Sequence, residues 1–206
     1  MTLFEYDQEI RSREGANYLC GVDEAGRGPL AGPVYAAAVI LPPGLTLEGL
    51  DDSKKLSEKA RERLFDQIKE KSSAWCIASA SVEEIETLNI LGAAMLAMRR
   101  TVKGLPAVPD LVLVDGNKLP QADLKMRAIT AGDRTSACIA AASILAKVAR
   151  DRHMLELAKM YPGYYFERHK GYGTKLHYQI LDEIGPCAAH RQSFLKKWKM
   201  TKEGKG

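Results

Sequence analysis

The 206-residue chain contains only four cysteines, and no two of them form a C-x-x-C pair. This spacing excludes a zinc knuckle and a dithiol redox pair, so we expect buried, reduced thiols. A long hydrophobic run is also missing. The longest stretch without a charge, residues 28–47, holds four prolines and cannot form a membrane-spanning helix. The first residues lack the basic start and apolar stretch of a secretory signal, so we expect a cytoplasmic protein with no membrane partner.

The net charge is small, at +4 from 30 basic and 26 acidic residues. The last eleven residues hold five lysines and one acid, so the rest of the chain is neutral. Within that remainder, residues 147–175 carry seven cations against three acids. A neutral body with two basic zones fits an anionic polymer as partner. On charge alone, a solvated helix face and a frayed tail explain the pattern better.

No repeat, low-complexity segment or flexible linker divides the chain. We therefore predict a single domain over residues 1–206, with a core at about 17–184 and a basic C-terminal extension at 185–206. Apolar runs and turn residues predict strands at 18–22, 34–41, 75–81, 111–114 and 125–130. Helical periodicity predicts helices at 3–14, 82–102 with a break near Asn89, 136–160 and 174–184, and another that begins at Ser57.

The order of these elements predicts an α/β fold. Two strands joined by a short turn, residues 18–22 and 34–41, favour an antiparallel pair. Residues 111–114 are apolar at every position, which is typical of a central strand covered on both faces. Three antiparallel strands followed by two strands that alternate with helices give a mixed five-stranded sheet with helices on both faces.

Acidic residues follow two of the predicted strands. Asp23 and Glu24 end the first strand, Asp115 ends the fourth, and Asp133 stands just before the long helix. If the first and fourth strands are neighbours, their backbones lie ~5 Å apart and the carboxylates could bracket one cation. Oxygen ligands favour Mg²⁺ or Mn²⁺. Singly, each acid is explained by turn chemistry, a helix cap or a pair with Arg27. Jointly, such a cluster would repel itself without a bound metal.

A glycine-rich turn follows the first strand, with Gly26, Arg27, Gly28 and Gly32 in close succession. It does not match the dinucleotide-binding G-x-G-x-x-G pattern, because Pro33 leads into a strand where that motif requires a helix. No P-loop pattern occurs elsewhere. The bare backbone of this turn can approach a ligand closely, and Arg27 supplies a phosphate-binding fork. The alternative is a plain tight turn.

These residues together resemble the motifs of the ribonuclease HII family, the type 2 ribonucleases H. The resemblance covers roughly residues 17–194, and its segments occur in order at 21–34, 52–57, 89–91, 114–117, 132–133, 139–151, 169–174 and 190–194. It implies an RNase H-like fold. It also implies a metal-dependent endonuclease that cleaves RNA in RNA–DNA hybrids and nicks duplex DNA on the 5′ side of a single embedded ribonucleotide.

The resemblance also assigns roles residue by residue. Asp23, Glu24, Asp115 and Asp133 match the four metal-binding acids, for a mechanism in which two Mg²⁺ or Mn²⁺ ions activate a water. Gly26, Arg27 and Gly28 match the loop that reads the ribose 2′-hydroxyl, the group that separates RNA from DNA. Tyr172 matches a tyrosine that stacks on the next sugar. The positions that match family residues facing the nucleic-acid backbone are Ser53, Lys54, Asn89 and Lys147.

The chain departs from the family pattern in two places. Ala131 stands where many members have a lysine, and residues 185–192 are looser than the usual proline-rich segment with two arginines. Gln192, Leu195 and Trp198 faintly resemble a sliding-clamp peptide, although a basic, loosely ordered end explains them better. The sequence shows no recognisable oligomer interface, so we expect a monomer. The four histidines have no zinc spacing, and we interpret them as structural or phosphate-facing.

Two other classes of function fit parts of this pattern. A non-catalytic module could bind RNA–DNA hybrids through the same basic zones, and it would do so in EDTA without cleavage. An RNase H-like integrase or junction nuclease could carry similar acids, but these enzymes usually lack the glycine-rich turn and the Lys170–Gly173 segment. Nicking of a duplex that contains one ribonucleotide distinguishes the three.

Overall fold

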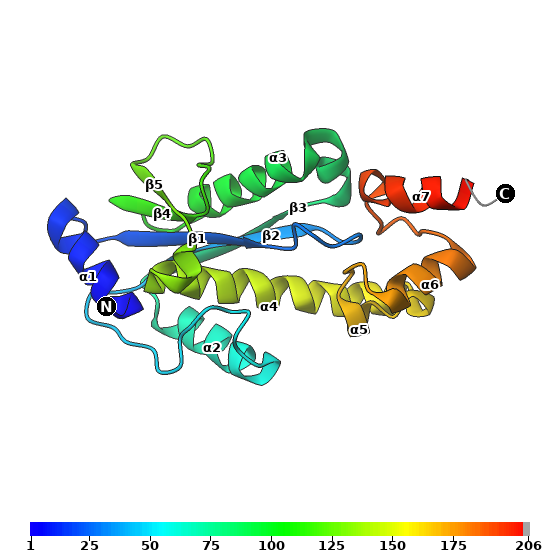
Figure 1. Cartoon of the computed structure of the whole chain (residues 1–206). Coiled ribbons are helices and arrows are strands. Elements are labelled where there is room, and N and C mark those ends of the chain that lie inside the picture. The colour runs from blue at the N-terminus through cyan, green and yellow to red at the C-terminus, as the bar shows by residue number, and fades with distance from the viewer. Residues whose placement is uncertain (204–206) are drawn as a thin grey trace.

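The computed structural model describes the backbone of residues 1–203. A sheet of five strands lies at its centre, as can be followed in Figure 1. The strands are β1 (Leu19–Ala25), β2 (Val34–Ile40), β3 (Ala74–Ala80), β4 (Leu111–Asp115) and β5 (Met126–Ile129). Their order across the sheet is β3-β2-β1-β4-β5. The β3–β2 and β2–β1 pairs are antiparallel, and the β1–β4 and β4–β5 pairs are parallel. The predicted mixed five-stranded sheet is confirmed.

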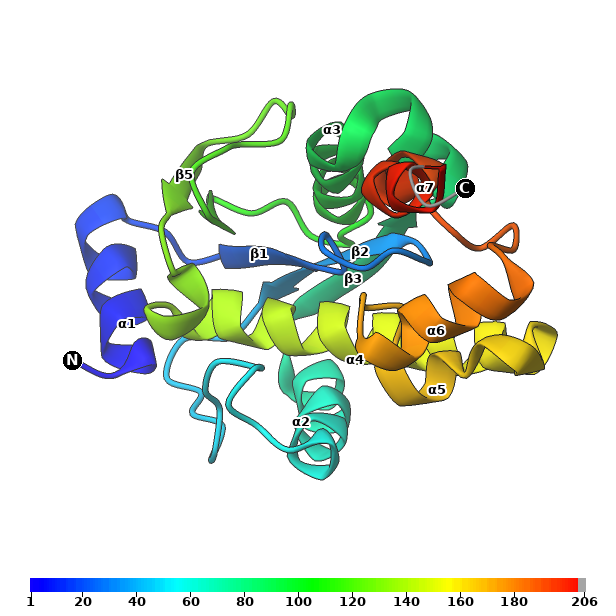
Figure 2. The same ribbon diagram turned by 45° about the vertical axis from the view of Figure 1, so that its right-hand side comes forward.

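The helices cover both faces of this sheet. The first four helices along the chain are α1 (Leu3–Glu14), α2 (Glu58–Lys71), α3 (Val82–Lys103) and α4 (Ala137–Met160). The C-terminal third adds α5 (Phe166–His169), α6 (Lys175–Ile184) and α7 (Lys196–Glu203), with the short 3-10 helices η1 (Gly132–Arg134), η2 (Pro162–Tyr164) and η3 (Gln192–Leu195). In Figures 1 and 2, α3 lies over one face, and α4 with α2 lies over the other.

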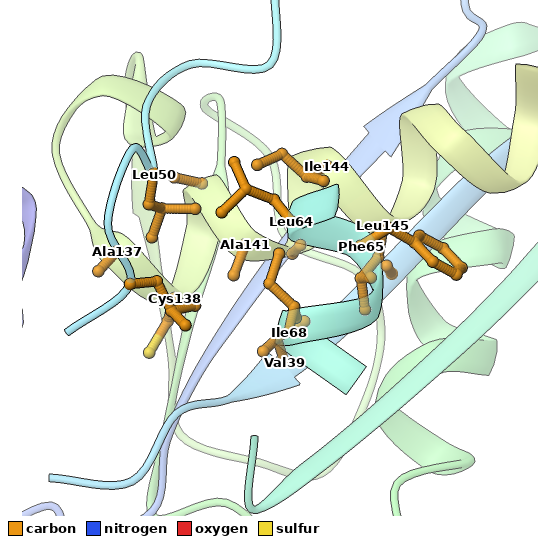
Figure 3. Close-up of a cluster of buried hydrophobic side chains, with 14 of the residues drawn as sticks. Val39, Leu50, Leu64, Phe65, Ile68, Ala137, Cys138, Ala141, Ile144 and Leu145 are labelled. Carbon is orange, nitrogen blue, oxygen red and sulfur yellow. The ribbon is translucent and has the colours of Figure 1, made fainter. Parts of the chain in front are cut away.

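The core has two main layers, one on each side of the sheet. On the α4 side, Leu64 and Ile68 of α2 meet Ile144 of α4 and Val39 of β2 (Figure 3). On the other side, buried residues of α3 pack against β1, β2 and β4. Since β1 and β4 are covered by helices on both faces, their carboxyl ends are held rigidly. This is the edge where the predicted acids lie.

Gly21 allows α4 to pack directly on the central strand. A Cβ at this position would overlap the backbone of Cys138 and Ile139 at the start of α4. Only a residue without a side chain permits this approach. The same helix begins with a cap, because the Ser136 side chain accepts a hydrogen bond from the Ile139 amide. The first turn of α4 is therefore fixed against β1, close to η1.

The C-terminal segment differs from the expectation of a loosely ordered end. His190, Arg191 and Leu195 are fully buried or nearly so. The segment contains η3 and α7, and Leu195 packs with Leu30 and Leu181. Local charge could not reveal this, because the few buried residues stand among exposed lysines. Residues 204–206 of the predicted extension lie outside the described residues. Among residues 1–203, no helix is both long and apolar enough to cross a bilayer.

Three of the four histidines are buried, which confirms the structural interpretation for these three. His169, His177 and His190 are buried together, and the Nε2 atoms of His177 and His190 lie 2.9 Å apart. The fourth, His153, places Nδ1 3.2 Å from the Tyr35 hydroxyl. Burial lowers the pKa of His177 and of His190 to about 4, so both rings are neutral at physiological pH.

Candidate active site

The end of β1 carries the first two predicted acids. The strand runs on to Ala25, two residues beyond Asp23. Because side chains alternate along a strand, Asp23 projects to the same face as Gly21, toward α4. The Asp23 side chain is buried and interacts with Ser143 of α4, and its Oδ1 accepts the Glu24 amide at 2.7 Å. Asp23 is therefore held at the junction of sheet and helix.

Asp115 ends the neighbouring strand at the same level. β1 and β4 are parallel with Val22 opposite Val114, so Asp23 and Asp115 follow directly at adjacent strand ends. The backbone amide of Gly132 donates to Asp115 Oδ1 at 2.6 Å. This bond brings η1, and with it Asp133, to the end of β4. The acids of β1, β4 and η1 therefore lie at the same edge of the sheet.

The site places these carboxylates close enough to alter one another's ionisation. Burial raises the pKa of Asp23 well above its ordinary value, and the charges of Glu24 and Asp115 raise it further. Burial also raises the pKa of Glu24, although the guanidinium of Arg27 opposes that shift. For Asp115, burial raises the pKa and the charge of Asp133 adds to it. Ionised together, these groups need a cation to balance them.

Lys54 supplies part of that balance. Its Nζ donates to Asp133 Oδ2 at 3.0 Å, from the loop that precedes α2. Burial alone would lower the pKa of Lys54, but Asp133, Asp52 and Asp23 raise it above its usual value. Ser53, the preceding residue, places its Oγ 2.8 Å from Ser143 Oγ. The loop is thus attached to α4 beside the acids.

A cavity of about 220 Å³ opens beside these groups. Its lining combines acids with basic, small and aromatic residues: Asp23, Glu24, Ala25, Gly26, Arg27, Ser53, Lys54, Asp115, Ser143, Lys147 and Tyr172. Nine of the twelve residues proposed from the sequence line it, and a tenth, Gly28, lies beside Tyr172 at its edge. Asp133 reaches the group through Lys54 and Asp115.

The glycine-rich turn and Tyr172 meet at one end of this cavity. A Cβ added to Gly28 would lie 3.9 Å from Cε1 of Tyr172, in otherwise open space. Gly26 has φ +99°, and a side chain there would collide with the guanidinium of Arg150. Lys147 Nζ lies 5.9 Å from the centre of the Tyr172 ring and 2.7 Å from Asp151 Oδ1. The two elements that the resemblance links to the ribose therefore adjoin.

Asn89 lies apart from this group. It is exposed in the kink of α3, with φ 58°, and its Oδ1 accepts the Leu91 amide at 2.9 Å and the Gly92 amide at 3.2 Å. The predicted break in this helix is confirmed, and Asn89 caps its second half. Asn89 does not line the cavity beside the acids. A substrate contact by Asn89 stays a prediction.

Sequence reasoning did not identify the two buried arginines under the glycine-rich turn. Arg150 and Arg191 are fully buried, and both donate to backbone carbonyls of residues 26–33. Each belongs to a family-like segment, but neither was given a role. The bonds of a buried arginine to backbone carbonyls leave no pattern in the sequence, because any residue can supply such a carbonyl.

The acids suit a hard divalent cation by their chemistry, since all of them offer carboxylate oxygens. As placed here, however, no three or more acidic, histidine or cysteine side chains among the described residues form a ready-made ion site. Each of the four acids already has one oxygen engaged: Asp23 Oδ1 by the Glu24 amide, Glu24 Oε1 by Arg27, Asp115 Oδ1 by the Gly132 amide and Asp133 Oδ2 by Lys54. A cation at Asp133 would therefore compete with the Lys54 ammonium.

Comparison with known proteins supports the family resemblance that the sequence motifs indicated. The ribonuclease HII family model matches residues 20–200. Ribonuclease HII of Idiomarina loihiensis is 57% identical over 176 residues, which cover 85% of this chain and 94% of the relative. Ribonuclease H2 of Pyrococcus horikoshii superposes with a TM-score of 0.71 at 22% identity, over 87% of this chain and 95% of that one.

A further solved structure is the PCNA:RNase HII complex from Archaeoglobus fulgidus. It matches with a TM-score of 0.65 at 25% identity, over 84% of this chain and 93% of that one. The shared sheet and helices show the RNase H-like fold, and the family model with its relatives in sequence places the chain among the hydrolytic nucleases of the ribonuclease H class. The chain belongs to the ribonuclease HII family. It is a ribonuclease H that cleaves RNA in RNA–DNA hybrids, and the alternatives of a non-catalytic module or a junction nuclease are removed.

Proposed function

We propose that this ribonuclease H depends on Mg²⁺ or Mn²⁺ and nicks duplex DNA on the 5′ side of a single embedded ribonucleotide, as well as cutting RNA tracts in hybrids. The observation that carries the proposal is the position of Asp23 and Asp115 at adjacent strand ends. They share one cavity with the Gly26–Gly28 turn and Tyr172. A site for phosphodiester cleavage and a site for the ribose are thus combined.

The metal requirement follows from the charge of the site. Asp23, Glu24, Asp115 and Asp133 would hold the ions. When bound, such ions would supply a nucleophilic water at neutral pH and stabilise the leaving oxygen, so that the products would be a 3′-hydroxyl and a 5′-phosphate. No side chain needs to act as the nucleophile. The protein's own part is to hold the carboxylates together on rigid strand ends.

Selection of the ribonucleotide is assigned to the other end of the cavity. The amides of Arg27 and Gly28 donate no backbone hydrogen bond within residues 1–203, so they can donate to a 2′-hydroxyl. Tyr172 is 41% exposed next to Gly28, where it can stack on the following sugar. A deoxyribose offers no hydroxyl to these donors.

Four further residues are proposed to face the nucleic-acid backbone. Ser53, Lys54 and Lys147 line the cavity, and Asn89 lies on the kink of α3. Lys54 and Lys147 offer positive charge to phosphates. Lys54 forms an ion pair with Asp133, and Lys147 forms one with Asp151. Binding of the duplex would exchange these ion pairs for contacts with phosphates.

A duplex DNA oligonucleotide with one ribonucleotide tests the proposal. The end-labelled strand is incubated with the enzyme in Mg²⁺, in Mn²⁺ and in EDTA, beside an all-DNA duplex and an RNA–DNA hybrid. We expect one nick 5′ of the ribonucleotide in either metal and none in EDTA. Cleavage of the hybrid alone would reject the single-ribonucleotide activity, and cleavage in EDTA would reject the metal requirement.

Asp23→Asn and Asp115→Asn provide the matched variants, because each change removes a charge and keeps the side-chain shape. Both should reduce cleavage to the level of the EDTA control while the fold is retained. Full activity in either variant, purified from a host that lacks its own ribonucleases H, would refute the assignment of the acids. Circular dichroism on the same preparations confirms folding.

A contact with a sliding clamp is also part of the proposal. The Archaeoglobus fulgidus relative is a complex with PCNA. In this chain Leu195 of the clamp-like segment is buried, and Trp198 Nε1 donates to Asp182 Oδ1 at 2.9 Å. The segment would have to detach from α6 to bind a clamp. Retention of the protein on an immobilised bacterial clamp, lost on Trp198→Ala, would support the contact, and no retention would reject it.

The cytoplasm and a monomeric state belong to the same proposal. Cys20, Cys76, Cys138 and Cys187 are all free thiols, as is normal in a reducing compartment. Light scattering at assay concentrations should give a mass near 22.7 kDa. A dimer mass would reject the monomer.

A further inference from the structure

Arg191 is a fully buried cation beneath the glycine-rich turn. Its guanidinium donates to five backbone carbonyls at 2.6–3.3 Å, those of Gly26, Arg27, Pro29, Gly32 and Pro33. One side chain, 158 or more residues distant in sequence, therefore reaches both ends of the turn. The bonds to Gly26 and Arg27 fall within the segment that the proposed function assigns to the ribose.

These bonds are costly to replace. The side chain is fully removed from water, and this burial, together with the nearby charge of Arg150, lowers the pKa of Arg191 to about 9. Arg191 is held by carbonyl dipoles, and the carbonyls in turn have been withdrawn from solvent. If Arg191 were removed, several buried acceptors would lose their donor at once. The turn would then have to open to water to satisfy them.

The backbone beside Arg191 reinforces the same contact. The Arg191 amide donates to the Leu30 carbonyl at 2.8 Å, and the Gly32 amide donates to the Ala189 carbonyl at 2.8 Å. On the other side, the Leu30 amide donates to the carbonyl of Gly171 at 2.8 Å. The turn is thus attached both to the C-terminal segment and to the residue that precedes Tyr172. Arg150 adds bonds to Ala31 and Pro33 from α4.

We infer that Arg191 is a positioning residue for ribonucleotide recognition. By occupying the inward carbonyls of Gly26 and Arg27, it fixes the peptide planes so that the amides of Arg27 and Gly28 stay available to the substrate. Arg191 does not contact the substrate itself. This inference rests on the proposed function of the turn, and it gives the C-terminal segment a role in substrate selection.

The test compares Arg191→Met with Arg11→Met. Arg11 is another buried arginine that donates to backbone carbonyls, those of Asn17 and Leu41, at the α1 end of the molecule. Both variants lose a buried guanidinium and keep an unbranched side chain of similar length. Melting temperatures are measured first, and assays are run at a temperature at which both are folded. Arg191→Lys, which retains the charge with fewer donors, is the conservative variant.

Two readouts separate positioning from general destabilisation. The first is steady-state nicking of the one-ribonucleotide duplex, with the matching all-DNA duplex as competitive inhibitor. For Arg191→Met we expect kcat/KM to fall by about a hundredfold, largely through KM, while the inhibition constant of the all-DNA duplex is unchanged. Arg191→Lys should recover part of the loss, and Arg11→Met should keep the wild-type KM.

The second readout is hydrogen–deuterium exchange of the peptide that contains residues 26–32, which requires no activity. It should exchange faster in Arg191→Met and at the wild-type rate in Arg11→Met. Unchanged exchange in Arg191→Met, or an equal rise of KM in both variants, would overturn the inference. If the wild type fails to nick the one-ribonucleotide duplex, the proposed function fails, and the exchange result still decides whether Arg191 fixes the turn.

Discussion

Lys54 and Asp133 form an ion pair, with Nζ 3.0 Å from Oδ2, at the mouth of the acidic cluster. The carboxylate is buried, whereas 73% of the lysine side chain is exposed. Solvent therefore screens the pair, and it contributes little to the stability of the fold. Its importance is local, because the ammonium occupies an oxygen of an acid that the proposed mechanism assigns to a divalent ion.

Lys54→Met should increase the effect of metal on stability. Without the ammonium, a divalent ion no longer competes for Asp133. We expect a melting temperature close to the wild-type value in EDTA, and a larger rise on addition of Mn²⁺ than the wild type shows. Differential scanning fluorimetry over a Mn²⁺ series measures this. A smaller rise than in the wild type would show that Lys54 assists the ion.

Asp23→Asn should stabilise the metal-free protein at neutral pH. The pKa of Asp23 is raised in the fold, so above pH ~4 the unfolded chain releases a proton that the folded state retains. The free energy of unfolding therefore falls as the pH rises through this range, by about 1.4 kcal/mol for each unit of pKa shift.

Urea unfolding in EDTA at several pH values tests that prediction. The variant should exceed the wild type in stability at pH 7, and the difference should shrink as the pH approaches 4. Cleavage is lost in the same variant. Equal stability of the variant and the wild type at every pH would show that burial of the Asp23 carboxylate does not destabilise the fold.

Gly28→Ala and Gly21→Ala should have opposite effects. At Gly28 the added methyl meets only Tyr172, at 3.9 Å, so the fold should keep its stability within about 0.5 kcal/mol while nicking at a ribonucleotide falls. At Gly21 the methyl overlaps the backbone of α4, so unfolding should become easier by more than about 3 kcal/mol. Chemical denaturation and the nicking assay measure both. Wild-type nicking by Gly28→Ala would argue against close approach of the substrate.

Tyr172→Ala should lose activity on a single embedded ribonucleotide far more than it loses duplex affinity. The ring is 41% exposed beside Gly28, so its removal leaves the core intact but removes the stacking surface. Nicking rates and fluorescence anisotropy with the same duplex measure the two effects. An equal loss of both would indicate that Tyr172 has only a structural role.

The buried histidines should make the protein sensitive to mild acid. His177 and His190 keep a pKa of about 4 in the fold, against about 6.5 in the unfolded chain. The unfolded state therefore binds more protons between these values, and the free energy of unfolding falls as the pH drops from about 6.5 to 4. His190→Gln should reduce that slope in urea titrations. The same slope in the wild type and in His190→Gln would contradict the assignment.

Local sequence patterns predicted much of the fold. Ser57, Ser136 and Thr174, the first residues of predicted helices, are N-caps in the structure. The break at Asn89 was also located. Such features depend on neighbours in sequence, so a single chain reveals them. The burial of Arg191 depends on carbonyls far away in sequence, which no local pattern reports.

The candidate site was predictable to a similar extent. The acids were proposed because strand ends at one edge of a sheet converge, and the parallel β1–β4 pair places Asp23 and Asp115 at adjacent strand ends. The roles of the individual residues came from the family resemblance and stay predictions. The Lys54–Asp133 pair was not foreseen, because the loop before α2 could not be placed from sequence alone.

Anomalous scattering from crystals soaked in Mn²⁺ tests the central claim most directly. The account predicts manganese peaks among the carboxylates of Asp23, Glu24, Asp115 and Asp133, with Lys54 displaced from Asp133. Soaks of Asp115→Asn crystals serve as the control and should lose the peaks. Crystals of the wild type that show no manganese at this site, at a concentration that supports cleavage, would contradict it.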